Sequence, residues 1–590
     1  MNLLSLLQEK LTAALTGLVP HPETYGALVR PTQDERHGDY QANAAMPLAK
    51  VLGQKPLDVA RRIVERLALD DVVEPPAIAG PGFINFRFRS DWLARQLQAA
   101  AADDRLGVSS TARPRTVVID FSSPNVAKPM HVGHLRSTII GDSLTRLLRF
   151  LGHRVITDNH LGDWGTQFGM LLYGYKHYRN EEALRTDPVR EMARLYVKVR
   201  QEIAAGEDEA EEAANPVAEA CRQETAKLHA GDEENVRLWR LFMPWCLADI
   251  ERIYRRLDVR FDHTLGESFY HPMLADVVQS LLDRGIAQKS EGAVVVWFGA
   301  NEPPALIRKK DGAFTYMTTD LATIRYRVET WKPDAILYVV DFRQSLHFKN
   351  LFDTARRWGY DQVELVHVSF GSVLGPDRRP IKTREGGAIE LEQLLDEAVA
   401  RAEQQYERTR EERLARGEEV PELGADERRQ VAETVGLGAV KYADLSQNRE
   451  SDYVFNWDKM LAMDGNTATY MQYAYVRNRG IFRKSGAAVE PFRTEPPEPT
   501  LTHPAERALA LQLLRFSETL QAAAIEYRPH LICGYLWELA KSYSVFFQNC
   551  PVLRAETSVL TRSRLLLCDL TARTIQRGLD LLGIRTVERM

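Results

Sequence analysis

Two histidines set three residues apart stand out as groups that could do chemistry. His131 and His134 lie in the segment SSPNVAKPMHVGH, residues 122–134, with Lys128 just before them. The segment follows an apolar run and opens a helical pattern, so its free backbone N–H groups would favour a bound phosphate. On the first helical turn the two rings would share one face and could donate hydrogen bonds to phosphate oxygens as charge builds up. The segment predicts a nucleotide site, although histidines at a helix start are often simple caps.

A second cationic segment, PIKTREGG, covers residues 380–387. Lys382 and Arg384 could meet the phosphates of a nucleotide, and the two glycines favour a loop that moves. A surface turn that happens to carry two cations is the other interpretation. Gly133, between the two histidines, would let a nucleotide approach the backbone closely.

The elements that must position these residues follow a pattern of short apolar runs separated by helical segments. Residues 135–150 predict a helix directly after the histidine segment. Four apolar runs predict strands, at residues 116–121, 154–158, 335–340 and 363–368. Strands that are apolar almost throughout and alternate with helices indicate a parallel sheet covered on both faces.

The remaining chain predicts further domains around this sheet. Leucines recur at helical spacing from Leu3 to Leu15, and residues 83–88 alternate like a half-buried strand. The expected regions are an α+β domain at 1–105, the sheet domain at 106–390 with a helical insertion at about 175–260, a helical connector at 391–460 and an all-helical domain at 461–590. The expected fold class is α/β, with an α+β domain before the parallel sheet and an all-α bundle after it.

The composition bounds the class of protein. Of 590 residues, 44% are hydrophobic and 27% charged, as in a soluble chain of several globular domains. No stretch approaches the roughly 20 apolar residues of a membrane span. The five cysteines form no CxxC pair, so neither a zinc knuckle nor a disulfide framework is expected, and a reducing cytoplasm is. The net charge of −5 argues against a surface that binds polyanions everywhere.

Motifs along nearly the whole chain resemble the arginyl-tRNA synthetase family of class I aminoacyl-tRNA synthetases. HVGH resembles the HIGH signature of class I, and the flanking SSPNVAKPMHVGHLRSTIIGDSLTRLLRFLGH and DNHLGDWGTQFG look like this family. Further matching motifs occur in chain order: HGDYQANAAMPLAK, LGESFY, TYMTTDLA, VVDFRQSLHF, YMQYAYVR and the closing ERM. The second class I signature, KMSKS, is replaced here by PIKTREGG, and Lys128 could supply the missing charge. The resemblance implies a Rossmann-type catalytic domain and a C-terminal all-α anticodon-binding bundle.

The resemblance implies a site for arginine and ATP around the two histidines. An arginine side chain is a planar, permanent cation and needs carboxylates, and Glu267 and Asp320 are the matching acids. Tyr316 and Asp320 are four residues apart and would share one helix face. The implied arginine-binding residues are Ser123, Asn125, His131, Glu267, Tyr316, Asp320 and Gln344. The implied ATP-binding residues are Pro124, Met130, His131, Gly133, His134, Lys382 and Thr383. The implied catalytic residues are Lys128, His131, His134, Lys382 and Arg384.

The resemblance also implies contacts with tRNA at both ends of the chain. The implied residues are Phe83 and Asn85, which would touch the tRNA elbow, Tyr470, Tyr473 and Arg477 in the helical domain, and Met590 at the end. The spacing of Tyr470, Tyr473 and Arg477 also fits an ordinary core stripe. Aromatic and guanidinium planes, however, suit the unstacked bases of an anticodon.

The implied activity is arginine–tRNA ligation in two steps. The arginine carboxylate attacks the α-phosphate of ATP and releases pyrophosphate, and the terminal adenosine of tRNA(Arg) then takes the arginyl group. Mg²⁺ would come with the nucleotide, no protein-bound zinc or other metal site is expected, and activation is expected to need tRNA. The expected partners are tRNA(Arg), L-arginine and ATP, without DNA or a membrane, for a cytoplasmic monomer.

Two alternatives stay open at this point. One is a non-catalytic tRNA-binding or arginine-sensing relative of the same fold, against which the intact histidines and acids speak. The other is a different synthetase or a small-molecule adenylyltransferase, which would not need both the N-terminal domain and the helical tail.

Overall fold

The computed structural model describes residues 2–204, 215–299, 302–375, 377–379, 389–417 and 422–590. Lys382, Thr383 and Arg384, which the sequence places at the nucleotide, lie outside the described residues. The chain forms two compact units. The first unit contains Met1–Ser110, Ala462–Asp580 and Arg585–Met590, and the second contains Thr111–Leu461 and Leu581–Ile584.

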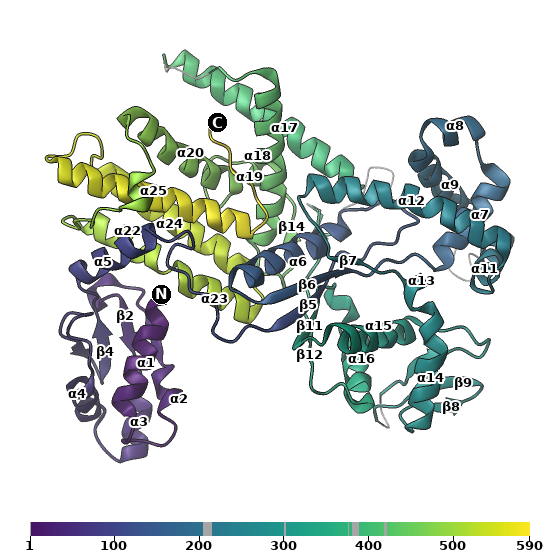
Figure 1. Ribbon diagram of the computed structural model, residues 1–590, viewed down its shortest axis with the longest axis horizontal. Helices are drawn as coiled ribbons and strands as arrows, with labels where there is room; N and C mark the ends of the chain where they lie inside the picture. Colours follow the sequence, from purple (N-terminus) through teal and green to yellow (C-terminus); the bar gives the residue numbers. More distant parts are fainter. Residues whose placement is uncertain (1, 205–214, 300–301, 376, 380–388, 418–421) are drawn as a thin grey trace. The chain divides into compact units, whose positions relative to one another are not determined.

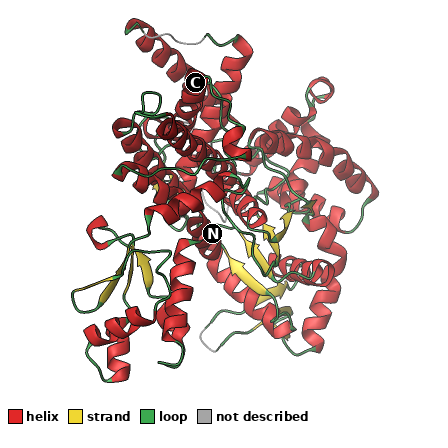
Figure 2. Cartoon of the chain, turned by 60° about the vertical axis from the view of Figure 1, so that its left-hand side comes forward, coloured by secondary structure: helices red, strands yellow, loops and turns green. Residues whose placement is uncertain are grey.

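A five-stranded parallel sheet forms the centre of the second unit (Figures 1 and 2). Its strands, in spatial order, are β12 (Glu364–His367), β11 (Ala335–Tyr338), β5 (Thr116–Asp120), β6 (Arg154–Asn159) and β7 (His263–Thr264). All neighbouring pairs are parallel. The four predicted strands and the predicted parallel sheet are confirmed, whereas β7 is too short to leave a pattern in the sequence.

Helices pack closely on this sheet. Val118 of β5 and Ile336 of β11 belong to one apolar cluster with three helices, α14 (Leu274–Asp283), α15 (Tyr316–Trp331) and α16 (Ser345–Trp358). The helix after β5, α6 (Gly133–Phe150), runs back along β5 and β6. Gly141 allows this close approach, because a Cβ there would lie 2.1 Å from Cγ of Phe121. The turn between β5 and α6 is therefore held at one end of the sheet.

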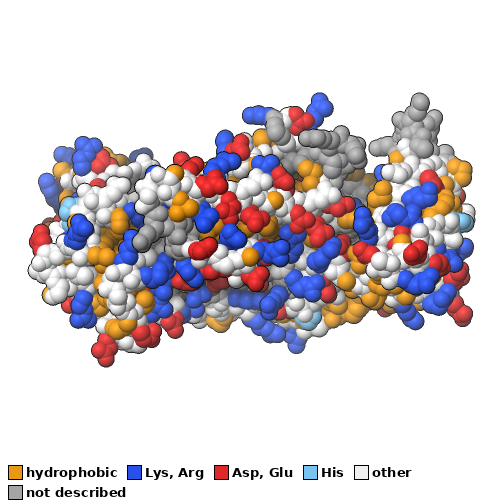
Figure 3. Space-filling view, turned by 90° about the horizontal axis from the view of Figure 1, so that it is seen from above, with side chains coloured by type: hydrophobic (Ala, Val, Ile, Leu, Met, Phe, Trp, Pro, Cys, Tyr) orange, Lys and Arg blue, Asp and Glu red, His pale blue; other side chains and the backbone are white. Residues whose placement is uncertain are grey.

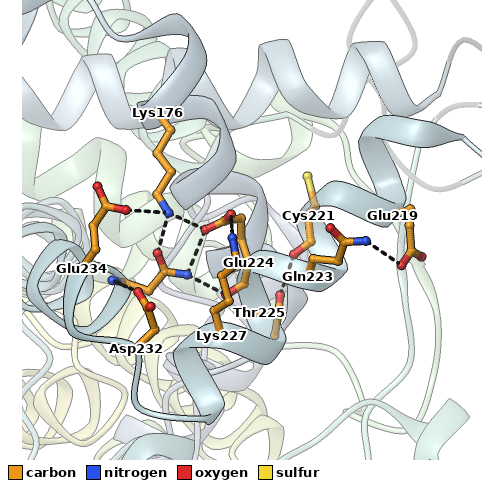
Figure 4. A network of polar contacts seen from close by, with 10 residues as sticks. Lys176, Glu219, Cys221, Gln223, Glu224, Thr225, Lys227, Asp232 and Glu234 are labelled. Atoms are coloured by element: carbon orange, nitrogen blue, oxygen red, sulfur yellow. Dashed lines mark hydrogen bonds and ion pairs between the residues drawn. The ribbon is translucent and has the colours of Figure 1, made fainter.

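A group of helices is inserted between β6 and β7. They are α7 (Thr166–Tyr178), α8 (Glu181–Thr186), α9 (Pro188–Ile203), α11 (Pro216–His229) and α12 (Glu233–Arg256). Figure 4 shows Glu224 of α11 at the centre of their polar contacts: its carboxylate accepts from Lys176 at 2.6 Å and from Lys227 at 2.9 Å. Lys176 also donates to Asn235 of α12 at 2.6 Å. Burial raises the pKa of Glu224, but these hydrogen bonds outweigh it and lower the pKa to about 2, so an ionised Glu224 ties α7 to α12.

A small antiparallel sheet, which the sequence does not predict, lies between α14 and α15 in the chain. Its strands are β10 (Ala305–Arg308), β9 (Ala293–Val296) and β8 (Gln288–Ser290), in that spatial order. The hydroxyls of Thr315 and Thr318 donate to the carbonyl of Ile307 at 3.2 and 2.5 Å. These bonds fix the start of α15, and with it Tyr316, on β10.

The charged region after residue 389, where the sequence predicts a helical connector, forms two long helices packed along each other, α17 (Leu391–Ala415) and α18 (Ala425–Leu445). Gly436 brings α18 close to α17, since a Cβ there would lie 2.7 Å from the carbonyl oxygen of Ala398. α18 is largely buried and not exposed, and Asp444 pairs with Arg136 of α6 at 3.1 Å. The chain continues through β14 (Tyr453–Val454), which pairs with β13 (Val373–Leu374), and α19 (Trp457–Met460).

The first unit combines both ends of the chain. Its N-terminal part is an antiparallel sheet in the order β1 (Val29–Pro31), β2 (Tyr40–Ala42), β4 (Phe83–Phe86) and β3 (Ala77–Ala79). The helices of that part are α1 (Leu3–Leu15), α2 (Pro22–Gly26), α3 (Ala45–Leu52), α4 (Pro56–Arg66) and α5 (Ser90–Ala101). Its C-terminal part is the predicted all-helical region, α20 (Ala468–Ser485), α21 (Pro491–Thr494), α22 (Pro504–Leu514), α23 (Phe516–Glu526), α24 (His530–Asn549) and α25 (Ser558–Leu581).

Buried polar contacts join these two parts of the first unit. Arg507 of α22 donates to Asp39 at 2.7 Å, and the hydroxyl of Tyr40 donates to Glu518 of α23 at 2.7 Å. In the part of the chain that the structure describes, no helix is long and apolar enough to cross a bilayer.

Candidate active site

Two residues in the left-handed backbone conformation turn the chain at the end of β5. Ser122 has φ 69° and Ser123 has φ 45°, which is unfavourable for residues other than glycine. Hydrogen bonds hold the turn: the N–H of Ser122 donates to the Ser137 hydroxyl at 2.8 Å, and the Ser122 hydroxyl lies 2.8 Å from that of Tyr254. The Ser123 hydroxyl donates to Asp120 at 2.8 Å. The turn therefore leads directly into the segment that carries the histidines.

A buried ion-pair network lies behind this turn. The guanidinium of Arg327 donates to Asp120 at 2.6 Å and to Asp158 at 2.9 Å. The two acids are register partners on adjacent strands, β5 and β6. Because Arg327 belongs to α15, the network ties the helix that begins at Tyr316 to the strand end that holds Ser123.

The two histidines form a tight pair at the start of α6. Their ring centroids lie 4.0 Å apart, the Nδ1 atom of His131 accepts the N–H of Gly133 at 3.1 Å, and the Nδ1 atom of His134 accepts the N–H of His131 at 3.0 Å. Burial, followed by the charges of His131 and Lys128, lowers the pKa of His134 to about 3. Burial and then Lys128 also lower the pKa of His131. Both rings are neutral at physiological pH, and their protons lie on Nε2, where they can be donated.

The structure gives a second reason for glycine at position 133, besides the close approach of a nucleotide expected from the sequence. A Cβ at this position would lie 2.8 Å from Cε1 of His131, so a larger residue would displace the ring. Glycine at position 133 therefore leaves room for the ring of His131, which lies over this turn.

The described chain is held by backbone pairing on either side of the second cationic segment, and after the segment this pairing is to the histidine turn. After the segment, Val132 donates to the carbonyl of Ile389 at 3.0 Å and Leu391 donates to that of Met130 at 2.9 Å, so residues 389–391 pair with the backbone around His131. Before it, β13 pairs with β14. Lys128 forms no ion pair with any described residue, and burial, followed by the charge of Arg200, lowers its pKa.

Three acids gather near the start of α15. Glu267 opens α13 (Glu267–Tyr270), and burial, followed by the charges of Asp163 and Asp320, raises its pKa to about 7. Partial burial, then Glu267 and Asp320, also raise the pKa of Tyr316. The structure thus brings the predicted Glu267, Tyr316 and Asp320 together. A group of carboxyls with this surplus of negative charge attracts a cation, which would return Glu267 to its ionised form.

The other predicted residues of the site lie at its edges. Pro124 and Asn125 pair with Gly162: the N–H of Gly162 donates to the Pro124 carbonyl at 3.1 Å, and a Cβ at Gly162 would lie 3.1 Å from the Asn125 amide nitrogen. Met130 is buried between these elements. Gln344 is exposed, ends the short helix η3 (Phe342–Gln344), and has no described hydrogen bond to Glu267 or Asp320.

Sequence reasoning missed two groups that contact the acids. Asp163 accepts from the backbone and hydroxyl of Ser268 at 2.9 and 2.5 Å, and burial raises its pKa. His347 lies 2.6 Å from Asp320 through Nε2. Both stand inside the motifs DNHLGDWGTQFG and VVDFRQSLHF, but nothing in their spacing indicates these contacts.

The predicted RNA-binding stripe lies on the partly exposed side of α20. The ring of Tyr470 packs 5.4 Å from that of Trp537, Tyr473 is 41% exposed, and the guanidinium of Arg477 lies 4.0 Å over the ring of Phe547. The buried side of α20 is formed by other residues, such as Met471. The stripe is therefore not the core stripe that the spacing alone would allow.

The remaining predicted RNA contacts are spread over the first unit. Phe83 is partly buried, and Asn85 is buried with its amide oxygen accepting from Gln41 at 2.8 Å. Met590 is partly exposed. Its neighbour Glu588 accepts from the hydroxyl of Tyr475 at 2.6 Å, which holds the end of the chain along α20.

Comparison with known families gives a match for each part of the chain. The family described as "tRNA synthetases class I (R), catalytic domain" matches residues 96–457. "Arginyl tRNA synthetase N terminal domain" matches residues 5–88, and "DALR anticodon binding domain" matches residues 471–590.

Individual relatives match over full length. The chain is 44% identical to an arginine–tRNA ligase of Rhodopirellula baltica and 45% identical to one of Edwardsiella ictaluri, with 100% of each chain covered. Among solved structures, the Plasmodium falciparum arginyl-tRNA synthetase has a TM-score of 0.81 at 28% identity, covering 99% of this chain and 98% of that one. The Thermus thermophilus arginyl-tRNA synthetase also has a TM-score of 0.81, at 26% identity and 100% coverage of both chains.

Proposed function

The chain belongs to the arginyl-tRNA synthetase family and is an arginine–tRNA ligase, and from this premise we propose which of its residues carry the reaction. Class I membership implies the use of ATP. The reaction then joins the arginine carboxylate to the α-phosphate of ATP before the arginyl group passes to the 3′-terminal adenosine of tRNA(Arg). The non-catalytic relative considered above is not favoured.

Glu267 and Asp320 hold the arginine cation in this proposal. The observation that carries it is their position near Asp163, where burial, followed by the charges of Asp163 and Asp320, raises the pKa of Glu267 to about 7. An arginine side chain supplies five donors in a plane and one positive charge, which suits such a pair of acids. Tyr316 stands on the same helix as Asp320, and Ser123, Asn125, His131 and Gln344 complete the arginine site.

ATP binds along the start of α6 in this proposal. Neutral His131 and His134 donate from Nε2 to the phosphates, and Gly133, Pro124 and Met130 line the nucleotide. Lys128, which has no carboxylate partner among the described residues, adds positive charge, together with Lys382, Thr383 and Arg384 beyond them. The described groups here are a cation and neutral imidazoles, which fits Mg²⁺ held by the phosphates and water; the ion would neutralise the leaving pyrophosphate.

tRNA binds to the first unit in this proposal. Tyr470, Tyr473 and Arg477 present two phenol rings and a guanidinium on one side of α20, as stacking on anticodon bases requires. Phe83 and Asn85, in the domain at 1–105, meet the tRNA elbow, and Met590 reaches the anticodon. Figure 3 shows Lys and Arg interspersed with Asp and Glu on the face that it displays.

The remaining expectations stay proposals. The proposed regions are a catalytic sheet domain at 106–390, a helical connector at 391–460 and an anticodon-binding helical domain at 461–590. The enzyme works as a cytoplasmic monomer without DNA or protein-bound zinc, and its five cysteines are free thiols. Activation of arginine needs bound tRNA.

Asp320→Asn tests the arginine site. The KM for arginine should rise by about 30-fold or more, because loss of one charged hydrogen-bond partner costs roughly 2–5 kcal/mol, while the KM for ATP should change little. Tritiated arginine and purified tRNA(Arg) give both constants. Asp353→Asn, which removes an exposed acid paired with Arg356, is the matched control. An unchanged KM for arginine in Asp320→Asn would remove Asp320 from the site.

A further inference from the structure

One of the two acids proposed to bind arginine, Asp320, is in contact with a histidine, His347. Nε2 of His347 lies 2.6 Å from a carboxylate oxygen of Asp320, and their side chains are 29% and 26% exposed. Asp320 stands on α15 and His347 on α16, two helices that pack against each other. The contact is therefore partly shielded from water and directed at the carboxylate that the proposed site needs.

Among the described residues, no carboxylate other than that of Asp320 is hydrogen-bonded to or ion-paired with His347. On α16 its ring packs at right angles against Phe348, 5.5 Å away, and Phe348 stacks in turn on His367 of β12. Nε2 of His367 lies 3.0 Å from the carbonyl of Val340, and burial lowers the pKa of His367, so it is neutral. Arg343 of η3 is paired with Asp341 at 2.7 Å.

The charge of His347 depends on Asp320. Burial lowers the pKa of His347, but the hydrogen bond and the charge of Asp320 outweigh burial and raise the pKa above its ordinary value. Contact with Asp320 therefore favours the imidazolium form of His347 more than water does for a free histidine.

We propose that His347 is a positioning residue. Before arginine binds, its imidazolium holds the Asp320 carboxylate in place, and arginine must displace this cation or cause it to lose its proton. The proposal rests on the assignment of Asp320 to the arginine site. A guanidinium and an imidazolium repel each other across one carboxylate, so arginine binding favours the neutral form of His347 and releases its proton. Neutral His347 can still donate Nε2–H to Asp320 and keep the carboxylate oriented.

The sign of the pH dependence follows from linkage. Where His347 is protonated in the empty enzyme, each pH unit upward should strengthen arginine binding about tenfold, because one proton leaves for each arginine bound. Glu267 contributes in the same direction, since its pKa of about 7 means that it must lose a proton to meet the guanidinium. Both effects appear in the slope of the logarithm of arginine affinity against pH. The contribution of His347 is therefore the difference between this slope in the wild type and in a variant without a titrating group at position 347.

His347→Gln isolates this contribution. The Nε2 amide of glutamine can donate to Asp320 as the imidazole does, but it cannot carry the charge. We expect the variant to bind arginine more tightly than the wild type at pH 6, by about tenfold for each unit that pH 6 lies below the pKa of His347. Damage to the pocket would weaken binding and cannot produce this gain. His347→Ala, which loses the donor as well, should bind more weakly than His347→Gln at pH 8.

The measurement is equilibrium dialysis of the full-length protein with radiolabelled arginine from pH 5.5 to 8.5, with calorimetry in two buffers of different ionisation enthalpy to count released protons. His177→Gln, an exposed histidine of α7, is the control and should keep the wild-type slope. Equal slopes and equal proton counts for wild type and His347→Gln would overturn the proposal. Asp320→Asn separates the two ideas: unchanged arginine binding in that variant refutes the site itself, whereas lost binding together with an unaltered His347→Gln slope refutes only the role of His347.

Discussion

At the scale of residues, the proposed site uses the two histidines as neutral donors and not as general acids. Each Nδ1 atom already accepts a backbone N–H, and burial, followed by the charges of His131 and Lys128, lowers the pKa of His134 to about 3. Nε2–H is therefore present throughout the physiological range. A fixed donor of this kind contributes most where charge develops on phosphate oxygens, because it needs no reorganisation during the reaction.

His134→Asn separates the two nitrogens of the ring. The asparagine oxygen can replace Nδ1 as acceptor for the N–H of His131, but nothing replaces Nε2–H. We expect the rate of arginyl-adenylate formation to fall about 100-fold or more. The pH profile between 6 and 9 should keep its shape, because a group with a pKa of about 3 does not titrate there. Single-turnover kinetics with tRNA present measures both.

A matched control for this variant exists in the same unit. His153 also accepts a backbone N–H through Nδ1, from Arg115 at 3.2 Å, but has no place in the proposed site. His153→Asn should keep the wild-type rate. If His134→Asn moved an acidic limb of the pH profile, the histidine would be a titrating group and the account of a neutral donor would be wrong.

At the scale of elements, α15 connects the proposed arginine site to the sheet. It begins at Tyr316, carries Asp320 one turn later, and places Arg327 between Asp120 and Asp158. Removing the cation leaves two buried acids without a neutralising charge, which costs about 3–5 kcal/mol. We therefore expect Arg327→Met to destabilise the second unit by about this amount at pH 7.5 and to lose arginine activation as well.

The loss of stability caused by Arg327→Met should be smaller at low pH than at high pH. Burial already raises the pKa of Asp158 although Arg327 opposes it, and without Arg327 the Asp158 carboxylate should bind a proton more readily in the folded than in the unfolded chain. Stability then falls as pH rises, so the deficit should be smaller at pH 5.5 than at pH 7.5. Urea unfolding at both values measures it. Arg325→Met, on the exposed side of the same helix, should cost at most about 1 kcal/mol, and an equal deficit at both pH values would contradict the mechanism.

The elements themselves could be predicted where their pattern is long. The strands of the parallel sheet and helix α6 follow from apolar runs and helical spacing, and their ends agree to within two residues. β7 to β10 were missed because runs of two to four residues carry too little pattern. Glu267 and Asp320 could be assigned only through the family motifs, since charge and spacing do not show that acids far apart in the chain meet. His347 and Asp163 lie in the same motifs, yet their contacts depend on how α13, α15 and α16 pack.

At the scale of the whole molecule, the short segment that starts at the last residue of α25 belongs to a different unit from the residues on either side of it. Leu581–Ile584 are part of the second unit, whereas the residues before and after them are part of the first. Within the second unit, Lys441 of α18 donates to the carbonyl of Gly583 at 2.6 Å, and Ser143 of α6 donates to that of Leu581 at 3.0 Å. α6 is the helix that begins with the two histidines. The chain therefore links the end that carries Met590 to the catalytic unit by a short, buried segment.

Gly583→Ala should weaken this link without touching either site. Gly583 has φ +69°, and a Cβ there would lie 2.5 Å from a carboxylate oxygen of Asp142 and 3.2 Å from the ammonium of Lys441. Gly285, at φ +65° with nothing within 4 Å of its Cβ position, is the matched control for backbone strain alone. If bound tRNA favours the competent state through this segment, it must bind that state better than the idle one, and a loosened segment reduces the difference. We expect wild-type ATP–pyrophosphate exchange with arginine to be nearly absent until tRNA(Arg) is added, and Gly285→Ala to behave like the wild type. Gly583→Ala should lose most of the stimulation by tRNA, while its dissociation constant for arginine stays unchanged. Strong exchange by nuclease-treated wild type without tRNA would refute the coupling, and full stimulation of Gly583→Ala would show that the coupling does not pass through residues 581–584.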